Sequence, residues 1–79
     1  MTDAELIARL GLALFGEAPG WQARLADALG VSQRNASRWC RGLLEPPAGI
    51  WVELLAIAEG RRQELDVVIS ELRQRSREP

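Results

Sequence analysis

The side chains best suited to chemistry in this sequence lie in the stretch 32–41. Its glutamine can pair with adenine through two hydrogen bonds, and its arginines can pair with O6 and N7 of guanine. If the stretch is helical, Ala36 and Trp39 turn inward and the polar residues turn outward. The first turns of such a helix are the part that reaches base edges in DNA. The candidate base-contacting residues are therefore Gln33, Arg34, Ser37 and Arg38.

Two short helices joined by a glycine turn would position these side chains. Leu25 and Leu29 lie four residues apart, on one face of a first helix. Gly30 follows them, and glycine readily adopts the left-handed backbone conformation that ends helices. Ser32 then stands where the N-cap of a second helix would be. This order predicts a helix-turn-helix over about residues 22–42.

The same segment resembles the helix-turn-helix of the phage repressor and Cro type, which is also common among small bacterial regulators. That family has a small residue in the first helix, a glycine turn followed by an apolar and a capping residue, and two buried positions in the second helix. The resemblance covers roughly a quarter of the chain and implies that the second helix enters the major groove of double-stranded DNA. The matching positions are Ala26, Gly30, Val31, Ser32, Ala36 and Trp39.

A second set of polar residues is expected to contact DNA phosphates. In the family that this segment resembles, the residue that opens the first helix of the motif clamps the DNA backbone, and Gln22 stands there. Arg41 lies near the end of the second helix, and Asn35 touches either phosphate or only solvent. The candidate phosphate-contacting residues are Gln22, Arg24, Ser32, Asn35 and Arg41.

The charges of the chain are unevenly distributed. The formal net charge of −1 gives no general attraction to nucleic acid. Residues 21–42, however, hold four arginines and one aspartate, whereas ten acids outnumber six arginines in the rest of the chain. Exposed charges are screened beyond about 8–10 Å at physiological salt, so the local excess matters more than the total. A basic motif on a slightly acidic body favours sequence-dependent binding over indiscriminate coating of DNA.

The residue types give no support to catalysis or metal binding. The sequence has no histidine, a single cysteine (Cys40) and no glycine-rich phosphate loop, and its acids show no spacing that suggests an acid–base pair. We therefore expect no enzyme activity, metal, cofactor or small-molecule effector. One cysteine cannot form an internal disulfide, which fits a cytoplasmic protein that is nucleoid-associated when bound to DNA. No apolar run is long enough to span a bilayer.

The rest of the chain predicts one compact all-α domain, residues 1–79, with four or five helices. A capping box that starts at Thr2 opens the first helix. Paired prolines stop the second helix of the motif, and a further helix starts near Pro47. Gly60 either ends that helix or merely bends it, so the C-terminal segment, about residues 48–75, forms one helix or two. The tryptophans expected to pack in the core are Trp21, Trp39 and Trp51.

An apolar stripe near the C-terminus allows two interpretations. Either it forms a dimer interface, or it folds back and completes a five-helix core. A single helix-turn-helix makes only a small contact with DNA, and such proteins usually gain affinity and specificity by dimerising. We favour a homodimer, with an interface that comprises Leu65, Val68, Ile69 and Leu72.

Together these features predict a small transcriptional regulator, a repressor that binds an inverted-repeat operator as a homodimer. A competing class is a protein-interaction module that keeps the fold without binding DNA, such as an adaptor or the antitoxin of a toxin pair. The net acidity and the apolar C-terminal segment favour that class. A third interpretation keeps DNA binding but gives the protein an architectural role, as a recombination accessory factor.

Overall fold

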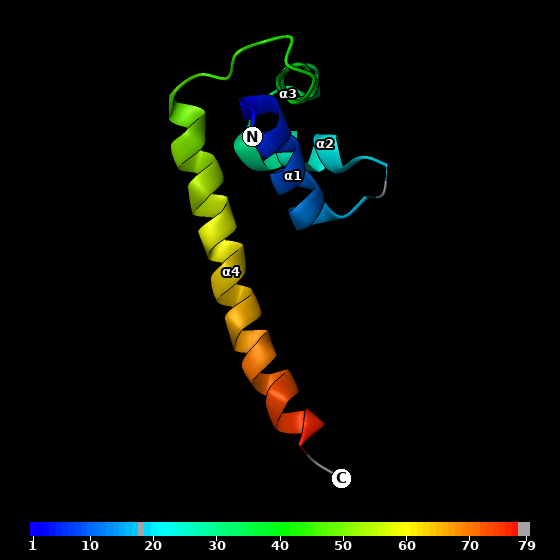
Figure 1. The fold of residues 1–79 in the computed structure, drawn as a ribbon, viewed down its shortest axis with the longest axis vertical. Helices are drawn as coiled ribbons and strands as arrows, with labels where there is room; N and C mark the ends of the chain where they lie inside the picture. The colour runs from blue at the N-terminus through cyan, green and yellow to red at the C-terminus, as the bar shows by residue number, and fades with distance from the viewer. Residues whose placement is uncertain (18, 78–79) are drawn as a thin grey trace.

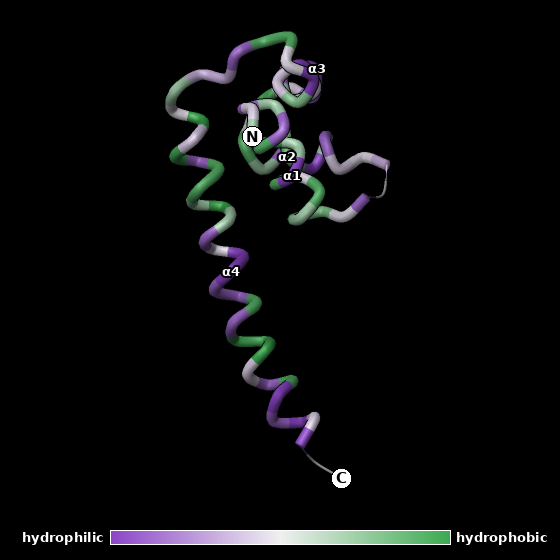
Figure 2. Tube along the Cα trace, in the orientation of Figure 1, coloured by the Kyte–Doolittle hydropathy of each residue, from purple (hydrophilic) through white to green (hydrophobic). Residues whose placement is uncertain are grey.

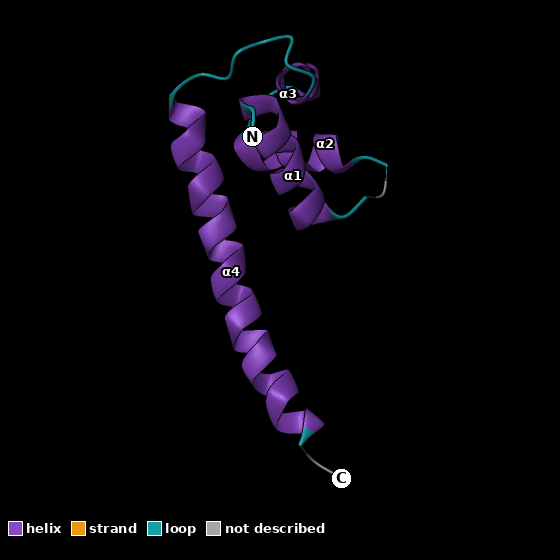
Figure 3. Ribbon diagram, in the orientation of Figure 1, coloured by secondary structure: helices purple, strands orange, loops and turns teal. Residues whose placement is uncertain are grey.

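Four α-helices make up the fold in a computed structural model, which describes residues 1–17 and 19–77. Three short helices form a compact group, and a long fourth helix packs beside them and then extends past them (Figure 1). No β-strand occurs in these described residues, so the all-α prediction is confirmed (Figure 3). None of the four helices combines the length and the apolar character that crossing a bilayer requires. The helices are α1 (Asp3–Phe15), α2 (Trp21–Leu29), α3 (Gln33–Cys40) and α4 (Gly49–Ser76).

The core lies where α1, α2, α3 and the first half of α4 meet. Every helix contributes at least one large apolar side chain to it, and no polar or charged residue of the described chain is buried. Trp39 is the tryptophan that is fully buried, whereas Trp21 and Trp51 are partly buried and pack against the cluster. The buried cluster comprises Ile7, Leu25, Leu29, Trp39, Ile50 and Leu54.

Helix α1 begins at the predicted cap. The hydroxyl of Thr2 accepts a hydrogen bond from the backbone N–H of Glu5 at 3.1 Å. The helix ends at Gly16, whose positive φ of 80° is a conformation that favours glycine. Between these ends Ile7 is completely buried, so α1 lies across α2 and α3 as one wall of the core.

Helix α4 is a single helix of 28 residues, so Gly60 does not end it and the five-helix alternative is wrong. A glycine inside a helix costs only about 1 kcal/mol relative to alanine. Arg61, the next residue, is held against the end of α1: its guanidinium donates a hydrogen bond to the carbonyl of Leu14 at 3.2 Å and lies 6.0 Å from the centre of the Phe15 ring. These contacts hold α4 against α1 at the point where the glycine weakens the helix.

The C-terminal part of α4 does not fold back onto the core. All residues from Glu59 to Arg77 are exposed. Hydrophobic positions nevertheless continue along this part of the helix (Figure 2). The predicted stripe is therefore outside the core of the monomer, and its members Leu65, Val68, Ile69 and Leu72 are 51%, 50%, 40% and 59% exposed.

A close contact between α1 and α2 involves Gly11 and Trp21. Gly11 is buried, and a Cβ atom built on it would overlap the ring atoms Cζ3 and Cε3 of Trp21. The indole ring therefore needs a residue without a side chain at this position of α1. The sequence analysis missed this contact, because a glycine within a helical pattern does not reveal which residue approaches it.

Replacing Gly11 should therefore destabilise the protein. Gly11→Ala adds a methyl group where Trp21 already lies, and we expect the free energy of unfolding to fall by about 1–2 kcal/mol despite the better helix propensity of alanine. Gly60→Ala is the matched control, because nothing lies within 4 Å of the added methyl group. That variant should gain about 0.5–1 kcal/mol. Urea unfolding of both variants measures the difference; equal effects would show that Trp21 does not restrict Gly11.

Candidate nucleic-acid interface

A tight turn connects α2 to α3. Gly30 has φ 69° and ψ 30°, the left-handed conformation expected of it. The backbone N–H of Val31 donates to the carbonyl of Ala26 at 3.0 Å, and the N–H of Gly30 donates to the carbonyl of Asp27 at 3.2 Å. These two bonds form a Schellman motif, which satisfies the free carbonyls at the end of α2 and fixes the direction in which the chain leaves it.

Ser32 caps the start of α3. Its side-chain oxygen accepts a hydrogen bond from the backbone N–H of Asn35 at 3.1 Å, and its extended backbone (φ −72°, ψ 147°) is typical of an N-cap. Helix α3 therefore begins at Gln33, as the sequence predicts. The cap and the glycine turn lie two residues apart, so the angle between α2 and α3 is set by local contacts at both helix ends.

The buried side chains of Ala36 and Trp39 determine how α3 is oriented. Ala36 is 0% exposed and Trp39 is 3% exposed, which places their side of the helix against α1 and α2. At about 100° per residue, the predicted DNA-contacting residues of α3 other than Asn35 fall within an arc of about 140° centred opposite these anchors. These residues are Gln33, Arg34, Ser37, Arg38 and Arg41.

The accessibility of these side chains differs along the helix. Gln33, Arg34 and Arg41 are exposed, whereas Ser37 and Arg38 are partly buried. Asn35 is exposed, but it lies nearer to the buried side of α3 than the others. Of the two candidates on α2, Arg24 is exposed and Gln22 is partly buried, and both lie in the first turn and a half of that helix. The candidates on α3 are therefore spread over this arc of about 140°, with Gln33 and Arg38 at its two edges, and those of α2 lie at the start of the neighbouring helix.

Helix α3 ends earlier than the prolines require. Gly42 has φ 73°, the N–H of Leu43 donates to the carbonyl of Arg38 at 2.9 Å, and the N–H of Gly42 donates to that of Trp39 at 3.2 Å. A second glycine-centred Schellman motif thus ends the helix several residues before Pro46. This finding corrects the prediction that the paired prolines stop the helix. Leu43, which continues the apolar spacing of α3, lies beyond its end and is 64% exposed.

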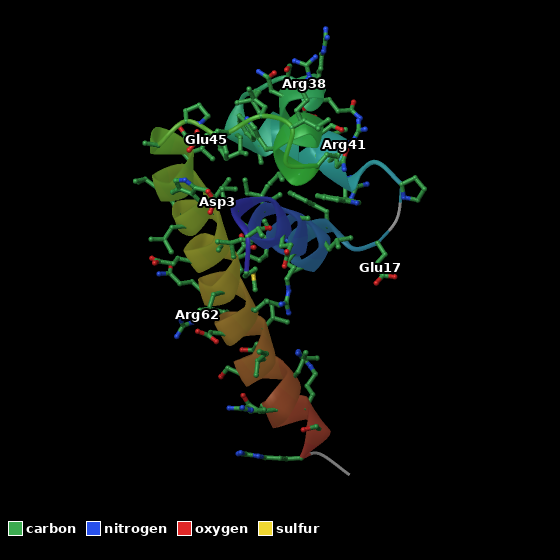
Figure 4. The ribbon with its side chains drawn as sticks, turned by 45° about the horizontal axis from the view of Figure 1, so that its top comes forward. Asp3, Glu17, Arg38, Arg41, Glu45 and Arg62 are labelled. Atoms are coloured by element: carbon green, nitrogen blue, oxygen red, sulfur yellow. The ribbon has the colours of Figure 1, made fainter. Side chains whose placement is uncertain are left out.

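The arginines of this surface form no ion pair with an acidic side chain within the described residues. The ion pairs within residues 1–17 and 19–77 join Arg61 to Glu64 and Arg75 to Glu71, both on α4. None of the four arginines between residues 21 and 42 is part of an ion pair there. Figure 4 shows Arg38 and Arg41 at the α3 end of the molecule; Arg41 lines one hollow together with Asp3 and Glu45, and it forms no ion pair with either within the described residues. The surface can therefore offer its arginines to an anionic ligand.

Cys40 contributes to the packing of α3. The side chain is partly buried against the core, and this burial raises the pKa of its thiol. A thiol with a raised pKa stays protonated at neutral pH and is a weaker nucleophile and metal ligand than a thiolate. Within the described part of the chain, no group of three or more Cys, Asp or Glu residues is placed to hold a metal ion.

Comparison with known proteins gives no match to a family model, to a curated protein or to a solved structure.

Removing the α3 cap should lower stability in a way that tests the turn. Ser32→Ala deletes the acceptor for the N–H of Asn35, and we expect the free energy of unfolding to fall by about 1 kcal/mol. Ser32→Asp keeps an acceptor at the same place and should retain most of the stability. Thermal unfolding followed by circular dichroism compares the two variants, and equal losses in both would show that the hydroxyl does not cap α3.

Proposed function

We propose that this chain is a sequence-specific DNA-binding regulator in which α2 and α3 act as a helix-turn-helix and α3 enters the major groove. The observation that carries the proposal is the two-sided character of α3. One side is anchored in the core by Ala36 and Trp39, and the other presents glutamine, arginines and serine, whose side chains form no hydrogen bond or ion pair among the described residues. Such a helix is both rigidly held and chemically suited to base edges.

The roles of the individual residues follow from their position. Gln33, Arg34, Ser37 and Arg38 are proposed to contact bases, since they occupy the first turns of α3. Arg41, at the end of the helix, suits a phosphate. The resemblance assigns Gln22 to the DNA backbone, and Arg24 stands two residues further along the same helix. Ser32 and Asn35 complete the proposed phosphate contacts, although the Ser32 hydroxyl and the N–H of Asn35 already bond to each other in the free protein.

The simplest regulatory mechanism for such a protein is steric. We propose repression, with a homodimer covering an inverted repeat and excluding polymerase from the same DNA, because this mechanism needs no contact other than the contact with DNA. Two-fold related copies of α3 would read the two half-sites.

Selection of bound sequences from a random DNA pool tests whether the protein binds DNA specifically. The selected sequences should contain an inverted repeat, and a pool without enrichment would refute specific binding.

Base contacts should appear as lost affinity for the selected site. Gln33→Ala and Arg38→Ala should each weaken cognate binding by about 1–3 kcal/mol and relax specificity at one position, because each removes hydrogen bonds to a base edge. Arg9→Ala, which removes the same charge from an exposed position of α1, is the matched control and should change affinity little. Fluorescence anisotropy at fixed salt measures all three. Unchanged affinity in both α3 variants would remove these residues from base recognition.

A phosphate contact should have a different signature. Arg41→Ala should weaken binding to cognate and unrelated DNA alike, because the charge it removes carries no sequence information. It should also reduce the slope of log K against log salt by about 1, since one fewer counterion is released. Titrations over a range of salt concentrations give the slope, and a slope equal to that of the unmodified protein would exclude the phosphate role.

A protein-interaction module remains the second candidate because of one observation. The exposed part of α4 carries apolar side chains at positions where solvent would favour polar ones. An adaptor or an antitoxin would use that surface for a partner and would leave the arginines of α3 without a role. A recombination accessory factor would use α3 as proposed but would occupy attachment sites and not promoters. Mapping the occupied DNA in cells separates these three possibilities.

A further inference from the structure

The C-terminal half of α4 has the same apolar face as the half that packs on the core. Eighteen residues make five full turns of an α-helix, so residues separated by eighteen point in the same direction. Three apolar residues of the exposed half follow three core-facing residues at this spacing. The pairs are Ile50 and Val68, Trp51 and Ile69, and Leu54 and Leu72. The apolar face therefore continues from the intramolecular interface into a region without any covering helix.

An apolar groove lies beside the first half of the same helix. It has a volume of about 240 Å³ and lies between α1 and α4, lined only by apolar side chains. Leu6 on α1 and Leu55 on α4 are 47% and 58% exposed at its edges, and Ala58 lies at its C-terminal end. The chain thus contains both an open apolar groove and an uncovered apolar helix, at opposite ends of α4.

We propose that a second copy of this chain covers both, with the two α4 helices antiparallel and the C-terminal half of each seated in the groove of the other. The inference rests on the homodimer of the proposed function and specifies how its two copies meet. A seam of five apolar residues and one arginine runs along α4. Its residues follow one another at alternating steps of three and four, which is the spacing of a two-stranded coiled coil. The seam consists of Leu55, Ala58, Arg62, Leu65, Ile69 and Leu72.

The spacing of this seam is the same when read from either end. We place a second copy in the opposite direction, with the two-fold axis between residues 63 and 64. Each seam residue of one copy then lies opposite a seam residue of the other. Leu72 then lies opposite Leu55 of the second copy, and Ile69 lies opposite its Ala58. Both Leu55 and Ala58 line the groove, so the tail of one copy fills the cavity of the other.

The one charged residue of the seam also favours this direction. Arg62 is exposed, projects outward from α4, and has no ion-pair partner within the described chain (Figure 4). In the antiparallel register it lies next to Asp66 of the second copy, which is likewise unpaired, and the two-fold axis makes this contact twice. A parallel copy would bring Arg62 against Arg62, two like charges inside the seam. The Arg62–Asp66 contact therefore favours the antiparallel dimer over a parallel dimer with Arg62 against Arg62.

Cysteine cross-linking tests the direction without any DNA. In a Cys40→Ala background, Ala58→Cys and Ile69→Cys are prepared as separate proteins of different tag size, mixed and mildly oxidised. We expect a cross-linked heterodimer, since residue 58 of one copy faces residue 69 of the other, and no cross-linked homodimer of either variant. A homodimer cross-linked through Ile69→Cys would show parallel pairing and overturn the proposal. Sedimentation equilibrium that finds only monomers, or dimers that never cross-link as a mixture, would overturn it as well.

A charge exchange provides the second measurement and keeps the monomer intact. Arg62→Asp should raise the dimer dissociation constant at least about tenfold, and the double variant Arg62→Asp with Asp66→Arg should restore dimerisation. Gln63→Asp, on the opposite side of α4, is the control and should change the dimer dissociation constant little. Failure of the double variant to recover would overturn the Arg62–Asp66 contact. Apart from Cys40→Ala, whose DNA binding is measured by itself as the reference, these variants leave α3 unchanged. Loss of DNA binding with retained cross-linking would therefore refute only the proposed function, and the converse only the antiparallel pairing.

Discussion

Burial of Trp39 is the interaction on which the arrangement of the molecule depends. The residue is 3% exposed and belongs to the cluster shared by all four helices. An indole buries about 150–250 Å², which corresponds to roughly 4–6 kcal/mol at 25 cal/mol per Å². The buried Nε1–H of Trp39 has no hydrogen-bond partner among the described residues, and its desolvation offsets about 1–3 kcal/mol of this gain. A helix of eight residues is too short to be stable by itself in water, so α3 exists because this side chain and Ala36 hold it against the rest of the protein. Once these two are buried, the orientation of every other residue of α3 follows.

This anchoring sets the position of the polar side of α3, whose side chains form no hydrogen bond or ion pair with other side chains of the described residues. The cap at Ser32 and the glycine at residue 30 fix the start of the helix, and Gly42 fixes its end. The backbone is therefore held at both ends and along one side. The arginines keep their freedom to adjust to a ligand, while their Cα positions are set by the core. A surface built in this way can bind an anionic partner without reorganising its backbone.

The two halves of helix α4 have different surroundings. Its first half completes the core through Ile50 and Leu54, and Arg61 holds it against the end of α1. Its second half adds length and apolar side chains, and all of its described residues are exposed. A monomer gains nothing from exposing such a face, since each of these side chains is more stable when removed from water. The uncovered half of α4 is therefore the part of the molecule whose sequence is least explained by the stability of the monomer.

Local features of the fold could be read from the sequence because they depend on neighbouring residues. The caps at Thr2 and Ser32, the left-handed turn at Gly30 and the inward side of α3 each involve residues that lie within one or two helical turns of each other. The candidate contacts on α3 follow from the same local geometry, since a helix with two buried positions has only one outward side.

Other features were decided only by the tertiary structure, since they depend on residues far apart in the chain. Gly60 could equally have broken the helix, and the contact of Arg61 with the Leu14 carbonyl, 47 residues away, holds α4 beside α1 there. The need for Gly11 arises from the Trp21 ring, which reaches it only after α1 and α2 have packed. The apolar stripe near the C-terminus allowed two interpretations, of which the sequence favoured the dimer interface, and the direction of α4 placed the stripe beyond the core. Hydrophobic spacing specifies that a face must be covered, but the path of the chain determines whether the chain itself can cover it.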